Sequence, residues 1–252
     1  MKRFLLFCVF IAMTVLMVNA CKHRPTESPA VIVKDAVTDV DGNTYDAVVI
    51  GEQTWMASNL KTTHYADGTE IPPGDITSSS DSLPYRYLPD NSVVGSDLLG
   101  LLYNWPAVMH GQSHSSENPS GVQGVCPDGW HVPSNPEWNT MIAAVKANDD
   151  YIEYSGSVAK ALAAAYGWDS ARVYLSPGRE MEINDATGFH ALPAGNFIFG
   201  TFNDVGQYAY FWTTSRTGNY FAGGRSIGFN TKEPTANDCS LFYGLSVRCV
   251  KD

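Results

Sequence analysis

The sequence contains little charge and few segments that could form a long amphipathic helix. Charged residues make up only 17% of the 252 residues, whereas 44% are hydrophobic and 12% are aromatic. Such a composition is typical of a folded chain with a substantial core and excludes a disordered or fibrous protein. The 22 glycines and 14 prolines indicate that irregular backbone covers much of the surface.

Common catalytic and metal-binding motifs are also missing. The sequence contains neither the G-x-S-x-G turn of serine hydrolases nor the H-E-x-x-H helix of zinc peptidases, and it has no nucleotide-binding glycine loop. Its cysteines never occur at the C-x2-C spacing of a zinc ribbon or a redox pair. We therefore expect a non-enzymatic protein with no cofactor and no bound metal.

The longest hydrophobic run extends from Phe4 to Val18, directly after two basic residues. This order is typical of a secretory signal peptide, and we predict one over residues 1–20. The small residue before Cys21 resembles the lipobox of bacterial lipoproteins, which predicts that Cys21 is lipidated. Because Asn19 is unusual in a lipobox, a plain signal peptide or an uncleaved anchor stays open as an alternative.

The polar residues 21–36 are typical of a tether, and residues 37–252 are expected to form one folded domain. These features predict an exported protein that is lipid-anchored to the outer membrane and faces the periplasm or the cell surface. Removal of the signal peptide leaves 14 basic against 26 acidic side chains, a net charge of −12. This charge argues against nucleic acid as a partner.

The cysteines that remain after the signal peptide and the lipidation site are Cys126, Cys239 and Cys249. In an exported protein they meet an oxidising compartment. Three cysteines allow one disulfide and leave one thiol free, and their spacing alone does not decide the pairing.

The segment from Cys126 to Trp138, CPDGWHVPSNPEW, contains a helix start. Ser134 and Glu137 have the spacing of a capping box, and Pro136 suits the first helical turn. Apolar residues then recur at helical spacing, at Trp138, Met141, Ile142 and Val145. We predict an amphipathic helix that ends near Asn148.

Strand patterns lie on both sides of this helix. Thr44 to Ile50 and Gln53 to Ala57 are typical of a β-hairpin, and several short strands separated by glycine-rich turns are expected between residues 187 and 250. A second helix is predicted over residues 157–166. This order indicates an α+β fold with a mixed or antiparallel sheet, two helices and long irregular loops.

Aromatic residues near the predicted loop ends are the best candidates for ligand contacts. Tyr208, Tyr210, Trp212 and Arg216 are of the residue types enriched in recognition surfaces, and flat rings also stack on sugars. Strand alternation buries about half of such rings, so Trp212 also fits a role in the core. His110 and His114 are expected to be solvent-exposed loop residues rather than metal ligands.

Seven segments together resemble one family of bacterial proteins. They are DVDGNTYDAVVIGEQTWMASNLKT, YADGTEIP, GLLYNW, VCPDGWHVPSNPEW, TGFHALPAGN, YFWTTS and GLSVRCVKD. In this order they resemble the Fibrobacter succinogenes major paralogous domain, found in exported bacterial proteins that are often lipoproteins. The family is similar to the C-type-lectin-like fold group, which also includes formylglycine-generating-enzyme-like domains.

The resemblance implies a disulfide between Cys126 and Cys249, with Cys239 free in the preceding loop. The signal peptide, Cys21, the tether and the missing catalytic motifs together predict adhesion, or binding of a glycan or an envelope protein. The alternatives are a diverged formylglycine-generating-type or glycan-active enzyme and a purely structural envelope component. The calcium-dependent sugar site of lectins is not matched, since Glu233-Pro234-Thr235 and Asn237-Asp238 have the wrong relative spacing.

Overall fold

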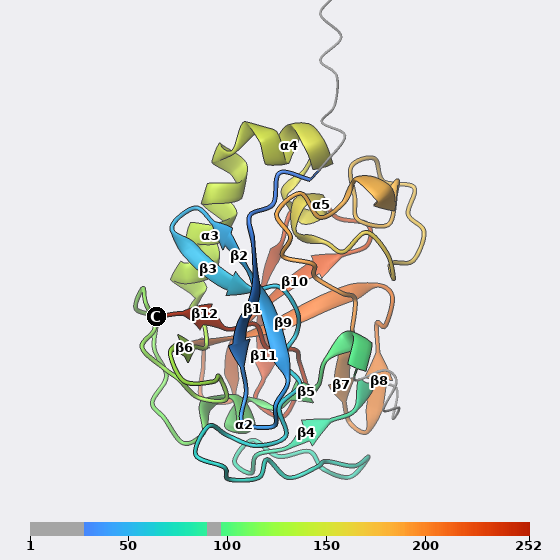
Figure 1. The fold of residues 1–252 in the computed structure, drawn as a ribbon. Helices are drawn as coiled ribbons and strands as arrows, with labels where there is room; N and C mark the ends of the chain where they lie inside the picture. Colours follow the sequence, from blue (N-terminus) through green and yellow to red (C-terminus); the bar gives the residue numbers. More distant parts are fainter. Residues whose placement is uncertain (1–27, 90–96) are drawn as a thin grey trace, which may run out of the picture.

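The computed structural model describes residues 28–89 and 97–252 (Figure 1). The predicted signal peptide, residues 1–20, and the predicted lipidation site Cys21 lie outside the described residues. Among the described helices, none is long and apolar enough to cross a membrane.

The first sheet has five strands in the order β1-β2-β3-β12-β6, and its pairs are antiparallel. The strands are β1 (Ile32–Thr38), β2 (Thr44–Ile50), β3 (Gln53–Met56), β6 (Trp130–His131) and β12 (Val250–Lys251). The predicted hairpin is confirmed as β2–β3. Val250 pairs with both Trp55 and His131, so the last strand lies between two early segments of the chain.

Strand β1 begins before the predicted start of the folded domain. Ile32 pairs with Val48 of β2, so residues that the sequence assigned to the 21–36 tether belong to this sheet. The strand lies at the sheet edge and leaves Ile32 49% and Val33 43% exposed. An exposed edge strand has no buried face, and its sequence therefore lacks the alternation by which a strand is recognised.

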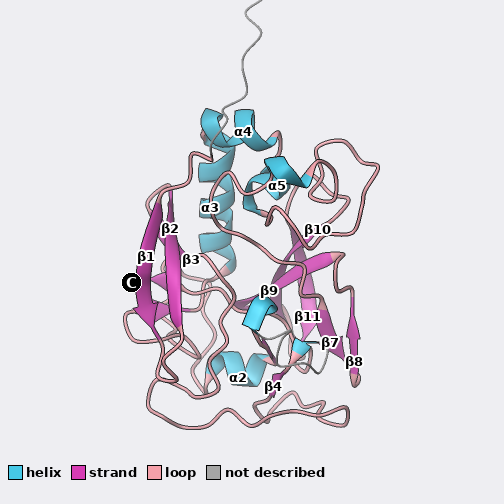
Figure 2. Cartoon of the chain, turned by 45° about the vertical axis from the view of Figure 1, so that its right-hand side comes forward, coloured by secondary structure: helices cyan, strands magenta, loops and turns pink. Residues whose placement is uncertain are grey.

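A second sheet contains β9 (Tyr208–Arg216), β10 (Phe221–Gly228) and β11 (Thr235–Ser240), again antiparallel, in the order β11-β10-β9 (Figure 2). The described residues also form two antiparallel strand pairs: β4 (Arg86–Tyr87) with β5 (Leu102–Tyr103), and β7 (Asn196–Ile198) with β8 (Thr201–Asn203). Strand β11 was not predicted, because its sequence TANDCS is polar. Cys239 lies on this strand rather than in a loop.

The predicted amphipathic helix is α3 (Asn135–Ala147), and both hydrogen bonds of its capping box form. Its apolar face buries Trp138, whose ring centre lies 5.1 Å from that of Trp55 in β3.

The second predicted helix is α5 (Val158–Leu162), which is shorter than expected. The prediction of two helices is wrong, since α2 (Trp105–Met109), α4 (Asp149–Ser155) and a 3-10 turn, η2 (Met181–Ile183), also form. Caps at Asn104 and Asn148 start α2 and α4, and these short helices have no periodicity of their own.

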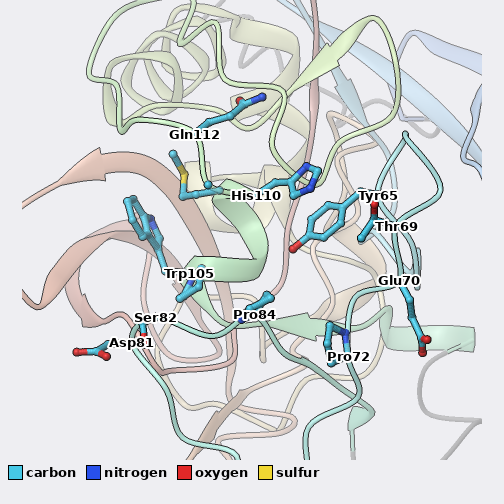
Figure 3. Close-up of a pocket in the computed structure, with 13 residues that line it drawn as sticks. Tyr65, Thr69, Glu70, Pro72, Asp81, Ser82, Pro84, Trp105, His110 and Gln112 are labelled. Atoms are coloured by element: carbon cyan, nitrogen blue, oxygen red, sulfur yellow. The ribbon is translucent and has the colours of Figure 1, made fainter.

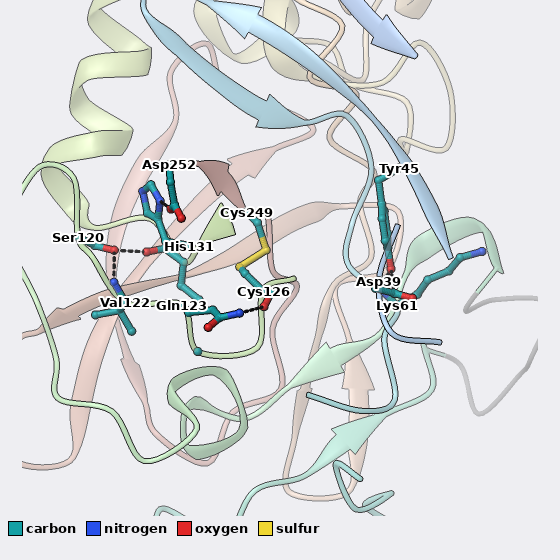
Figure 4. The surroundings of a disulfide bond; sticks show 12 residues. Asp39, Tyr45, Lys61, Ser120, Val122, Gln123, Cys126, His131, Cys249 and Asp252 are labelled. Atoms are coloured by element: carbon teal, nitrogen blue, oxygen red, sulfur yellow. Dashed lines mark hydrogen bonds and ion pairs between the residues drawn. A yellow bond between two sulfur atoms is a disulfide. The ribbon is translucent and has the colours of Figure 1, made fainter. Parts of the chain in front are cut away.

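The disulfide joins Cys126 to Cys249, as the resemblance implied (Figure 4). It connects the segment before α3 to the segment before β12 across 123 residues of sequence. Cys239 is free and buried. The fold is therefore an α+β arrangement of antiparallel sheets. The disulfide links the middle of the chain covalently to the segment that leads into its last strand.

His131 lies between two carboxylates beside this disulfide. Its Nε2 is 2.6 Å from Glu137 Oε1 and its Nδ1 is 2.7 Å from Asp252 Oδ1. Burial disfavours the imidazolium, but the hydrogen bonds to the two carboxylates outweigh burial and raise the pKa of His131. The protonated imidazole thus stabilises the fold by joining β6, α3 and Asp252.

We expect this contribution to depend on pH. A raised pKa in the folded state means that the stabilisation is fully present below the unfolded value of about 6.5 and is lost as the pH rises through the folded value. Denaturant unfolding of His131→Gln and the unmodified chain between pH 5.5 and 9 should show the largest stability difference at the acid end. His114→Gln, at an exposed loop histidine, is the control. A difference that does not change with pH would contradict the protonated clamp.

Candidate functional site

The four predicted ligand residues lie on β9, but the structure does not bring them to one surface. Trp212 is fully buried, and its indole N–H donates to the carbonyl oxygen of Tyr103 at 2.7 Å. The prediction that Trp212 contacts a ligand is therefore wrong. The residues from Phe211 to Ser215 are all buried because both faces of β9 are covered in this part of the strand, so simple alternation does not apply.

The other three residues lie at opposite ends of β9. Tyr208 and Tyr210 stack on each other with ring centres 5.4 Å apart, and Tyr210 donates to Asp204 at 2.9 Å. Tyr210 also lines a cavity of about 260 Å3. Arg216 lies at the far end of the strand, where its guanidinium is 5.0 Å from the ring centre of Trp105.

Trp105 belongs to a larger pocket, of about 420 Å3, beside α2 (Figure 3). Aromatic rings, prolines and a methionine form most of its wall, with hydroxyl, amide and carboxylate groups among them. The lining residues are Tyr65, Thr69, Glu70, Pro72, Asp81, Ser82, Pro84, Trp105, Pro106, Met109, His110, Gly111 and Gln112. Rings combined with a few polar groups are typical of a ligand pocket, so this is our candidate site.

Tyr65 supplies the most informative polar group of the pocket. Its side chain is only 3% exposed, and its hydroxyl has no hydrogen-bond partner in the structure. Figure 3 shows the hydroxyl oxygen directed toward the side of the pocket formed by Trp105, Pro84 and His110, and neighbouring atoms cover this oxygen from solvent. A buried hydroxyl without a partner loses its hydrogen bonds to water without compensation, at a cost of about 1–3 kcal/mol. A ligand that bonds to Tyr65 would remove this cost.

The Tyr65 hydroxyl stays protonated at neutral pH. Burial, followed by the charge of Asp67, raises the pKa of Tyr65 to about 12. The ring is held in place by His110, which stacks on it in parallel with the ring centres 3.6 Å apart. The hydroxyl is thus suited to donating and accepting hydrogen bonds rather than to acting as a base.

A tight turn positions Tyr65. The Tyr65 amide donates to the carbonyl of Thr69 at 2.9 Å, and Gly68 adopts φ +85° between them. Asp67 closes the turn by accepting from the amide of Thr69 at 2.8 Å. The YADGTEIP segment therefore presents Tyr65 on one side of the turn and Glu70 beyond it.

Asn104 holds the opposite wall against α2. Its Oδ1 accepts from the amides of Ala107 and Tyr85, which caps the helix and fixes the chain before β4. Its Nδ2 donates to the carbonyls of Ser80 and Leu83. Because this fully buried side chain makes all four of its hydrogen bonds, the 80–85 segment is held at a fixed position on the pocket.

The charged groups on the pocket wall are mostly acidic. Glu70 and Asp81 line the pocket, whereas no lysine or arginine does so among the described residues. Arg86 lies 3.7 Å from Glu70 without lining the pocket. Arg216 stacks on Trp105 and donates to the carbonyls of Gly218 and Asn219.

His110 is partly buried, and in the described part of the chain it belongs to no group of side chains that could hold a metal ion. Its side chain is 34% exposed and stacks on Tyr65, with Asp67 at 4.0 Å. Within residues 28–89 and 97–252, no group of three or more His, Cys, Asp or Glu side chains could hold a metal ion.

Two of the segments that carry the family resemblance, YADGTEIP and GLLYNW, contribute Tyr65, Thr69, Glu70, Pro72 and Trp105 to this pocket. The profile of the Fibrobacter succinogenes major domain matches residues 48–251. The chain belongs to this family. No curated protein and no solved structure matches the chain.

Sequence reasoning missed the pocket residues of this Fibrobacter succinogenes major domain. Tyr65 and Trp105 were noticed only as parts of YADGTEIP and GLLYNW, and His110 was assigned to an exposed loop. The available indication was composition, since aromatic rings are frequent in the walls of ligand pockets.

Proposed function

We propose that this chain is a non-enzymatic, lipid-anchored protein of the bacterial cell envelope whose folded part binds a glycan or an envelope protein. The unpartnered hydroxyl of Tyr65 in the pocket beside α2 is the observation that carries this proposal. A buried polar group without a partner in a preformed aromatic pocket is what a binding site is expected to contain.

The finer fold assignment is also a proposal. We infer a C-type-lectin-like arrangement because the cysteine before α3 is bonded to the segment that leads into the last strand. The second sheet and its long connections supply the irregular surface on which such domains place their binding sites. The predicted aromatic surface at Tyr208 and Tyr210 is less favoured than the pocket, because Tyr210 already donates to Asp204.

Blocking the pocket should strongly reduce retention of the protein on cell envelopes. Ser82 is exposed and lines the pocket, so Ser82→Trp places a large side chain at its mouth with little expected effect on stability. We expect the full chain carrying Cys21→Ser, which removes the predicted lipid, to bind envelope fractions, and Ser82→Trp in this background to reduce binding by about tenfold or more.

The matched control is Ser170→Trp, at an exposed residue that does not line the pocket. Sedimentation of the protein with envelope fractions, followed by quantitation of the bound share, measures the effect. Equal retention of both tryptophan variants would contradict binding through this pocket.

A further inference from the structure

We propose that the pocket beside α2 recognises a neutral sugar residue of a glycan and discriminates against acidic polysaccharides. This inference rests on the proposed function and names the ligand class of the same site. It is argued from the hydrogen-bonding groups of the pocket, from its charge and from its position in the fold.

The polar groups of the pocket match a polyol. Whereas the amide oxygen of Gln112 already accepts from the amide of Gly124, the hydroxyls of Tyr65, Thr69 and Ser82 can each both donate and accept hydrogen bonds. A sugar hydroxyl also does both and can satisfy both roles of the buried Tyr65 hydroxyl. An ammonium group only donates, and it would leave the proton of Tyr65 without an acceptor.

The apolar part of the wall matches the C–H groups of a sugar ring. Trp105, Met109 and the prolines at positions 72, 84 and 106 present carbon surface to the pocket. The volume of about 420 Å3 leaves room for one or two sugar residues rather than a folded protein element. Together the polar groups and the carbon surface offer the two kinds of contact that a pyranose makes, through its hydroxyls and through its C–H groups.

The charge of the wall disfavours anions. Glu70 and Asp81 lie at the solvent-exposed edge of the pocket, and no lysine or arginine lines it in the described part of the chain (Figure 3). A uronate or phosphate that entered would approach these solvent-exposed carboxylates with no lining cation to pair with in the described part of the chain, and salt would screen the repulsion. Carboxylates instead accept hydrogen bonds from neutral sugar hydroxyls. The acidic balance of the whole chain acts in the same direction.

The pocket lies at the end of the domain away from the start of the described chain. Ser28 donates to the carbonyl of Asp185 at 3.0 Å, and the amide of Asp185 donates to Lys160 in α5. Figures 1 and 2 both place α5 at one end and α2 with β4 at the other. The pocket thus lies opposite the end at which the described chain begins, so the predicted anchor at Cys21 would leave it accessible to a glycan.

Affinity electrophoresis tests this inference with the full chain carrying Cys21→Ser. The neutral probes are hydroxyethylcellulose, xylan, galactomannan and glycol chitin, and the acidic probes are alginate and polygalacturonate. We expect retardation by at least one neutral polymer and none by the acidic polymers. Tyr65→Phe, which removes only the hydroxyl, should weaken binding by about tenfold, whereas Tyr174→Phe, at an exposed tyrosine outside the pocket, should not.

Equal or stronger binding to the acidic polymers would overturn the inference, and so would neutral binding that is the same for Tyr65→Phe and the parent. If no polysaccharide binds but Ser82→Trp still strongly reduces retention on envelope fractions, the ligand is an envelope protein. The inference then fails while the proposed function stands. If Ser82→Trp has no effect on retention either, both fail.

Discussion

Replacing Cys126 and Cys249 together by alanine is expected to lower the free energy of unfolding by about 4–5 kcal/mol. The two cysteines are 123 residues apart, so the bond closes a long loop in the unfolded chain. In the chain-entropy account, the stabilisation grows with the logarithm of the loop length and reaches about 4.7 kcal/mol near 100 residues. Both cysteines are also fully buried, so their replacement removes core contacts as well.

Equilibrium unfolding in guanidinium chloride measures this loss. Addition of a reductant should destabilise the parent protein by a similar amount and leave the double-alanine variant unchanged. Cys239→Ala serves as the matched control, because it removes a buried sulfur without removing a cross-link. A loss below about 1 kcal/mol for the double variant would show that the bond does not constrain the unfolded chain.

The elements near this disulfide could be predicted because their determinants are local. The capping box at the start of α3 needs only Ser134 and Glu137, whose mutual hydrogen bonds form as expected. The β2–β3 hairpin is set by a two-residue turn and by the alternation of its strands. The disulfide, by contrast, was implied by the family resemblance, since three cysteines leave the pairing open.

The candidate pocket could not be predicted in the same way because its walls come from separate segments. Tyr65 and Trp105 are 40 positions apart, and they line one space because His110, at the end of α2, stacks on Tyr65. No spacing rule relates a loop tyrosine to a helix tryptophan. The misplaced ligand residue Trp212 has a related cause, since burial of both faces of β9 depends on the segments packed over it.

Arg248 is the other feature that local patterns do not indicate. Its side chain is fully buried, and it donates to the carbonyl oxygens of Met56, Phe189 and His190. A further bond of 2.7 Å connects its Nε to Asn59 Oδ1. Burial lowers the pKa of Arg248 to about 9, which leaves the guanidinium charged at neutral pH.

The hydrogen-bond acceptors around Arg248 determine how much stability is lost when its guanidinium is removed. A buried ion pair can be replaced by apolar side chains at little cost when both partners are exchanged. Three of the partners of Arg248 are backbone carbonyls, which no substitution removes, and they belong to segments far apart in the sequence. Loss of the guanidinium therefore leaves several buried acceptors without a donor.

We expect Arg248→Met to lower the free energy of unfolding by about 3–5 kcal/mol, although methionine has similar length and is apolar. Arg248→Lys should restore only part of this loss, since an ammonium group cannot reproduce the planar set of donors that the guanidinium directs at Asn59 and the carbonyls. Arg172→Met, at an exposed arginine, is the control and should change stability by less than about 0.5 kcal/mol. Guanidinium chloride unfolding measures all three variants, and far-ultraviolet circular dichroism confirms that each one is folded.

An Arg248→Met variant as stable as Arg172→Met would contradict this prediction. The buried carbonyls would then not depend on the guanidinium, and hydrophobic contacts alone would explain the packing of the segments around Phe189.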